Sequence, residues 1–121
     1  MEEIKDLNNI DNFKKHLIDL IDERTTNNIF KGFTFDGHVF SMSISAQINL
    51  SNLFNIPDAL FPLPYSTLNE DVYSLTLANK QNFYLTALSF KNNTIQAGTS
   101  LKQQVLACTT IEQLQNILDN L

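Results

Sequence analysis

Apolar residues recur at steps of three and four between residues 10 and 27, which is the spacing of an amphipathic helix. Acidic residues fall on or beside the opposite side. The spacing predicts an N-terminal helix over 10–27, capped by Asn9 or Asp11. The turn-forming run Thr25-Thr26-Asn27-Asn28 is expected to end it, and residues before Ile10 either extend the helix or fray.

Residues 33–40 consist of two short alternating runs on either side of Asp36-Gly37. A two-residue Asp-Gly loop favours a type I′ turn, because both central residues need positive φ. The sequence therefore predicts a β-hairpin over 33–40, with Asp36 and Gly37 as its structural turn. Phenylalanines dominate one face of this hairpin, and we expect that face to pack on the first helix.

A second helix is predicted over 43–55, capped by Ser41 or Ser43 and stopped by Pro57. The apolar side expected for it consists of Ile44, Ile48, Leu50, Leu53 and Phe54. Residues 57–71 contain three prolines among several apolar residues and predict an ordered loop. Such a loop either covers the core or forms an exposed docking patch.

The C-terminal part predicts a second hairpin over 72–85, followed by a helix pair over 86–121. Thr86 is the expected cap of the first of these helices, within which Gly98 allows either close packing or a kink. Thr109 and Glu112 have the spacing of a capping box for the last helix. Residues 1–121 thus predict a single compact α+β domain with about four helices and two short β-hairpins.

Composition narrows the possible settings and partners. The 121 residues are 43% hydrophobic and carry a net charge of −5, which argues against direct nucleic-acid binding. No apolar run approaches the roughly 20 residues that span a membrane, and the acidic N-terminus does not resemble a secretory signal. We expect no membrane association, and a chain kept in a cytoplasm-like environment or in a particle assembled there.

The search for chemical motifs gives structural interpretations. The single cysteine, Cys108, excludes an intrachain disulfide and fits a small core residue. His16 and His38 have no ligand-spaced partner, and there is neither a Gly-x-Ser-x-Gly motif nor a glycine-rich phosphate loop. We therefore predict no catalytic residue, no metal site, no cofactor and no enzymatic activity. A small enzyme stays as a third hypothesis, and it would need a pocket with convergent polar groups.

Arg24, the only arginine, falls near the end of the first predicted helix. It either satisfies the helix dipole or anchors the helix to carbonyl groups of the neighbouring hairpin. We favour the anchor.

The order of these motifs resembles an uncharacterised domain, of unknown function, found in the tail and tail-fibre proteins of tailed bacteriophages. The similarity covers about residues 20–118, and it is carried by Arg24, Gly32-Phe33-Thr34-Phe35-Asp36-Gly37, Phe40-Ser41, Gln47, Leu75-Thr76-Leu77 and the run Ala107-Cys108-Thr109-Thr110-Ile111-Glu112-Gln113-Leu114. The resemblance implies a phage setting and no catalytic residues. Because no shaft or adhesin sequence accompanies it, we expect a small component that joins larger virion proteins rather than a fibre.

The leading hypothesis is a structural or assembly component of a tailed-phage virion, in the tail or head–tail region. It would be made in the host cytoplasm and bind other virion proteins in several symmetric copies. The alternative is a phage-encoded regulatory or host-directed binding module that is not retained in the virion. The residues predicted to contact a partner are Leu60, Phe61, Leu63 and Tyr65 of the 57–71 loop, and Leu114 and Leu118 of the last helix.

Overall fold

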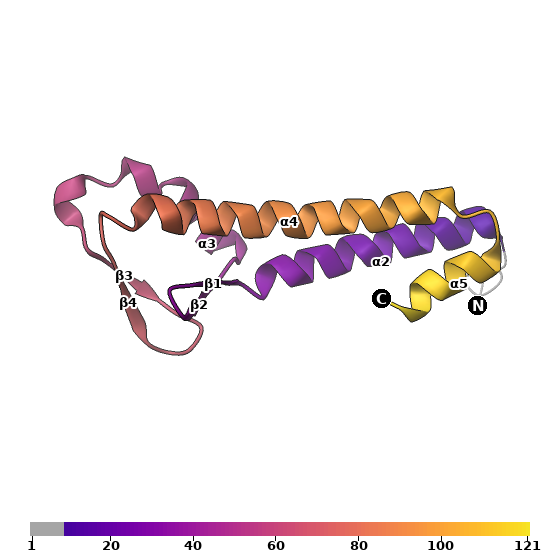
Figure 1. Ribbon diagram of the computed structural model, residues 1–121, viewed down its shortest axis with the longest axis horizontal. Helices are drawn as coiled ribbons and strands as arrows, with labels where there is room; N and C mark the ends of the chain where they lie inside the picture. Colours follow the sequence, from indigo (N-terminus) through magenta and orange to yellow (C-terminus); the bar gives the residue numbers. More distant parts are fainter. Residues whose placement is uncertain (1–8) are drawn as a thin grey trace. The chain divides into compact units, whose positions relative to one another are not determined.

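A computed structural model describes residues 9–121, and these form two compact units, each with its own apolar core. Unit 1 combines the chain up to Thr26 with residues 94–121, and unit 2 is residues 27–93. The long helices α2 (Ile10–Phe30) and α4 (Lys80–Ala107) each contribute residues to both units (Figure 1). Four α-helices and two antiparallel two-stranded sheets in the described chain confirm the predicted α+β class.

Unit 1 is helical and packs its core between α2, α4 and the last helix, α5 (Ile111–Asp119), which turns back after α4 (Figure 1). The buried residues of this core are Phe13, Leu17, Ile21, Val105 and Leu114. Polar contacts join α2 to α4 at the surface. The Lys102 ammonium lies 2.7 Å from the Asp22 carboxylate, and Lys14 donates to the carbonyl of Leu106 at 2.9 Å.

Helix α2 begins as predicted but ends later. Asn9 caps it, since its side-chain oxygen accepts the backbone N–H of Asp11 at 2.9 Å. The predicted end at residue 27 is wrong, because the helix continues to Phe30 and carries Ile29 into the core of unit 2. The stop is instead Gly32, which has a φ of +91° and donates its N–H to the carbonyl of Ile29.

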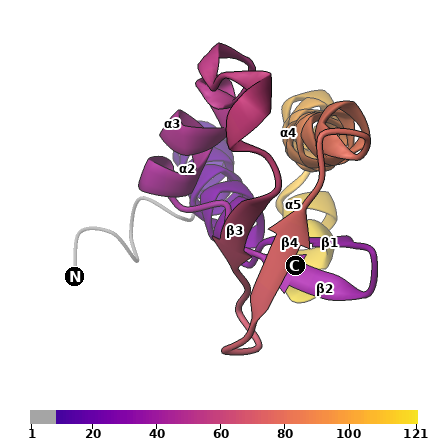
Figure 2. The same cartoon turned by 90° about the vertical axis from the view of Figure 1, so that its left-hand side faces the viewer.

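Unit 2 contains both hairpins, the short helix α3 (Ile44–Ser51) and the first part of α4. In Figure 2, α3 and α4 lie on the same side of the hairpins. The first hairpin forms as predicted: β1 (Phe33–Phe35) pairs with β2 (His38–Phe40), and Phe33 lies opposite Phe40. Asp36 and Gly37 form the turn, with φ of 51° and 75°. The aromatic face of this hairpin packs against Phe83 of α4, and α2 contributes Ile29 to the same core. The first helix, on which we expected this face to pack, therefore supplies only part of its contacts.

The second hairpin lies earlier in the chain than predicted. Strand β3 (Leu63–Ser66) falls within the predicted 57–71 loop and pairs with β4 (Val72–Leu75), so that Tyr65 lies opposite Tyr73. The predicted hairpin over 72–85 is therefore wrong. Pro62 and Pro64 obscured β3 in the sequence. Pro62 precedes the strand, and Pro64 is tolerated within it because a strand in a two-stranded sheet has an unpaired edge.

Helix α4 begins at Lys80, six residues before the predicted cap Thr86, so this cap is also wrong. Phe83 and Ala87 are 2% and 0% exposed, one helical turn apart. Their burial against the hairpins outweighs the strand propensity of Phe83-Tyr84-Leu85. The helix predicted over 43–55 is also too long, because α3 ends at Ser51. Two 3₁₀ turns follow it, η1 (Leu53–Asn55) and η2 (Asp58–Leu60).

The caps of α3 and α5 are defined by side-chain hydrogen bonds. Ser43 caps α3 as predicted, accepting the N–H of Ala46. The capping box of α5 uses Thr110 and Gln113, one residue after the predicted pair Thr109 and Glu112. Thr110 accepts the N–H of Gln113, whose side chain reaches back to the N–H of Thr110.

Gly98 allows close packing of α4 against α2 inside unit 1. It is buried, and a Cβ built on it would overlap the hydroxyl oxygen of Thr25. We expect Gly98→Ala to lower the free energy of unfolding by about 1–3 kcal/mol, although alanine gains about 1 kcal/mol in helix propensity.

In a Thr25→Ala background, the same Gly98→Ala change should raise the free energy of unfolding by up to about 1 kcal/mol, because the overlapping oxygen is gone. Urea unfolding of the wild type, both single variants and the double variant measures this reversal of sign. Destabilisation of equal size in both backgrounds would refute the packing argument.

Candidate functional site

The outer face of helix α3 carries two of the large apolar side chains that are most exposed in unit 2. Ile44 and Ile48 are one helical turn apart, and they are 66% and 56% exposed. The sequence predicted one apolar side that contains both isoleucines together with Leu50, Leu53 and Phe54, but the structure leaves Ile44, Ile48 and Phe54 exposed. Leu50 and Leu53 are the residues that enter the core, at 9% and 0% exposure.

The four predicted contact residues of the 57–71 segment differ in exposure. Leu60 is 60% exposed, as a contact residue must be. Phe61 is half-buried, and its ring centroid lies 5.2 Å from the ammonium of Lys80, which also pairs with Asp58. Leu63 and Tyr65 are half-buried against the core of unit 2. Only Leu60 of this group is largely available to a partner.

The two predicted contact residues of the last helix belong to the interior of unit 1. Leu114 is 0% exposed, so its assignment as a partner contact is corrected to a core role. Leu118 is half-buried against the same core. The apolar stripe of α5 serves the intramolecular core, which a stripe alone does not distinguish from a binding face.

Arg24 lies in unit 1, on the exposed surface of α2. It lines a shallow hollow of about 200 Å³ together with residues of α4 and of the C-terminal segment, among them Gln104, Asn116 and Asn120. The other residues that line this hollow belong to α4, to α5 and to the residues after α5. The anchoring of Arg24 to the hairpin stays a prediction.

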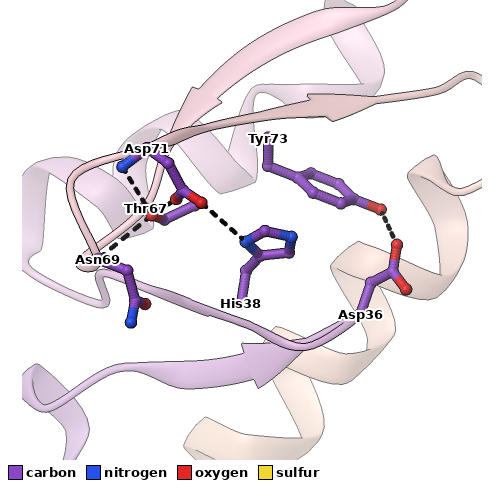
Figure 3. Close-up of polar contacts among 6 residues, drawn as sticks. All are labelled: Asp36, His38, Thr67, Asn69, Asp71 and Tyr73. Carbon is purple, nitrogen blue, oxygen red and sulfur yellow. Dashed lines mark hydrogen bonds and ion pairs between the residues drawn. The ribbon is translucent and has the colours of Figure 1, made fainter.

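Polar side chains join the two hairpins of unit 2 (Figure 3). The Tyr73 hydroxyl donates to the Asp36 carboxylate at 2.8 Å, and His38 Nδ1 lies 3.5 Å from an oxygen of Asp71. Thr67 donates its hydroxyl to Asp71, and it accepts the backbone N–H of Asn69 at 3.2 Å. The cluster therefore closes the loop between β3 and β4 and ties it to the first hairpin.

This cluster lacks the geometry of nucleophilic catalysis. A hydroxyl nucleophile needs the histidine as its hydrogen-bond acceptor. Here the Thr67 hydroxyl donates to Asp71, the residue that pairs with His38, so its proton is directed to the carboxylate and not to the imidazole. Burial raises the pKa of Tyr73, and its hydrogen bond to Asp36 raises that pKa further. A protonated tyrosine is the form that donates this bond.

Sequence reasoning missed most of this cluster. Asp36 was assigned to the turn alone, and Thr67, Asp71 and Tyr73 carried no recognisable motif. Tyr73 and Asp36 are 37 residues apart, and no local pattern reports a contact over that separation. The Thr67-to-Asp71 spacing is the one signal that was available, because threonine commonly closes turns through its hydroxyl.

Unit 2 also contains a cavity of about 500 Å³ that is half-open to solvent. Its walls come from α3, from β3 with the residues around it, and from the rings of Phe33, Phe40 and Phe83. Tyr65 is part of the wall, and burial raises the pKa of its phenol.

The described chain contains neither a metal cluster nor a membrane span. Within residues 9–121, no three His, Cys, Asp or Glu side chains are grouped so that they could hold a metal ion. Of the helices in that range, none combines the length and the apolar character needed to cross a membrane.

Comparisons with known proteins give no relative. No family model matches this chain. Neither a curated protein nor a solved structure matches it.

Proposed function

We propose that this chain is a protein-interaction module that binds its partner through the outer face of α3. The observation that carries the proposal is the exposure of Ile44 and Ile48, at 66% and 56%, on adjacent turns of one helix. Burying an isoleucine side chain contributes about 1.5–3 kcal/mol, so covering two of them supplies a sizeable part of a binding energy.

We further propose that the partner is another virion protein of a tailed phage, in the tail or head–tail region, bound in several symmetric copies. The similarity over Arg24 to Ser41 supports this setting. The net charge of −5 is consistent with a protein partner rather than a nucleic acid.

Mass spectrometry of purified phage particles tests the setting. The proposal expects the chain to be present at a fixed ratio to a tail or neck protein. Absence from mature particles would refute the virion role, and co-purification with a host protein from infected cells would favour the regulatory alternative.

The double substitution Ile44→Ser/Ile48→Ser tests the surface itself. With about 1–2 kcal/mol lost per side chain, the dissociation constant of the complex should rise by about 30- to 700-fold. The matched control is Leu106→Ser in unit 1, which removes an apolar side chain that is 60% exposed. Both variants should unfold at wild-type urea concentrations. Equal affinity of the double variant and the wild type would contradict the assignment of this face.

A further inference from the structure

We infer that the cavity of unit 2 is a binding site for a small, neutral and largely apolar molecule. The cavity measures about 500 Å³, within the range of roughly 300–1,000 Å³ that is usual for small-molecule sites. A single apolar side chain inserted by a partner would fill only part of it, so a separate small molecule is the occupant that suits its size.

The wall determines the chemical class of the ligand. Its floor is formed by buried apolar side chains of the core, among them Phe33, Phe40 and Phe83. Its rim is formed by the exposed residues Asn49, Asn52, Pro64 and Ser66. None of the described residues that line it is an Asp, Glu, Lys, Arg or His. A charged ligand would find no counter-ion in this wall and would lose part of its hydration, so the wall favours neutral molecules.

A few polar groups in the wall supply hydrogen-bonding capacity. Asn49 lines the exposed mouth of the cavity and Tyr65 lines its half-buried wall, and both can bond to a ligand that replaces water there. An apolar cavity with a small number of polar groups is the usual composition of a ligand site, in which those groups orient the ligand. We therefore expect an apolar body with one or two hydroxyl, carbonyl or amide groups.

The cavity is separate from the proposed interaction face, although helix α3 contributes to both. Ala46, Asn49 and Leu50 line the cavity, whereas Ile44 and Ile48 are exposed to solvent. Substitutions on the outer face therefore leave the cavity wall intact. This separation makes failure of the ligand site and failure of the interaction face distinguishable.

Fluorescence of the neutral apolar probe N-phenyl-1-naphthylamine tests the site. The full chain should bind the probe saturably with one site per chain, and decanol should displace it. Ala46→Phe fills the cavity and should weaken binding at least about tenfold. Its matched control is Ala97→Phe, the same change at an exposed helical position of unit 1, which should bind like the wild type.

Two further measurements keep the test decisive if Ala46→Phe does not fold. Ser66→Phe places a ring at an exposed strand position in the cavity wall and should also weaken binding. In the wild type, the probe should shift the methyl NMR signals of Met42 and Leu50 but not that of Leu106. The inference is overturned if the probe does not saturate, if folded cavity variants bind normally, or if the shifts occur elsewhere. Unchanged probe binding by Ile44→Ser/Ile48→Ser is expected whichever partner the outer face binds.

Discussion

Replacing Phe83 by alanine is expected to lower the free energy of unfolding by about 3–5 kcal/mol. Its side chain is 2% exposed and lies at the centre of the aromatic core of unit 2. Its ring centroid is 5.4 Å from that of Phe33, 5.0 Å from that of Phe40 and 5.1 Å from that of Tyr65. The substitution removes these contacts at once and leaves a void where both hairpins meet α4.

Urea unfolding followed by far-UV circular dichroism measures this loss, with Phe54→Ala as the matched control. Phe54 is 48% exposed and packs on Tyr84, with 5.0 Å between ring centroids, so its loss should cost about 1 kcal/mol or less. Equal effects of the two substitutions would mean that Phe83 is not at the centre of a packed core.

Leu114→Ala is expected to destabilise the free chain by about 2–5 kcal/mol, because Leu114 is 0% exposed in the core of unit 1. The sequence-based assignment of Leu114 as a partner contact predicts a different result. A contact residue could be truncated without loss of stability in the free chain.

Urea unfolding of the isolated protein therefore separates the two roles. Leu106→Ala is the control, since this leucine is 60% exposed and its truncation should change the free energy of unfolding by less than about 1 kcal/mol. A stable Leu114→Ala variant that no longer binds its partner would restore the contact assignment.

Features fixed by local chemistry could be predicted from the sequence. The Asp36-Gly37 hairpin forms with the predicted register, because a two-residue turn that needs positive φ determines the pairing by itself. The caps at Asn9 and Ser43 are also local, since each involves a side chain and a backbone N–H two or three residues away.

Features fixed by tertiary packing could not be predicted in the same way. Phe83-Tyr84-Leu85 suits a strand as well as a helix, and the burial of Phe83 among rings from distant segments decides for the helix. In α3, Ile44 and Leu50 are equally apolar in the sequence, and only the packed structure shows which of them faces solvent.

The exposure of the candidate contact residues could likewise be predicted only in part. Loop residue Leu60 was predicted to be available and is exposed, whereas Leu114 was predicted on the surface and is buried. The cavity and the Asp36–Tyr73 contact each depend on segments brought together by folding, so no single window of sequence contains them. The two isoleucines of the α3 face lie in one short window, but packing decides that they stay exposed.

Cysteine labelling at position 48 in the assembled particle tests the central claim most directly. The substitution Ile48→Cys is made in a Cys108→Ser background, which removes the only native thiol. In the free chain, position 48 should react readily with a maleimide, because the native side chain is 56% exposed. The account predicts that the same thiol is strongly protected in the particle, and equal labelling rates in the free and assembled states would contradict it.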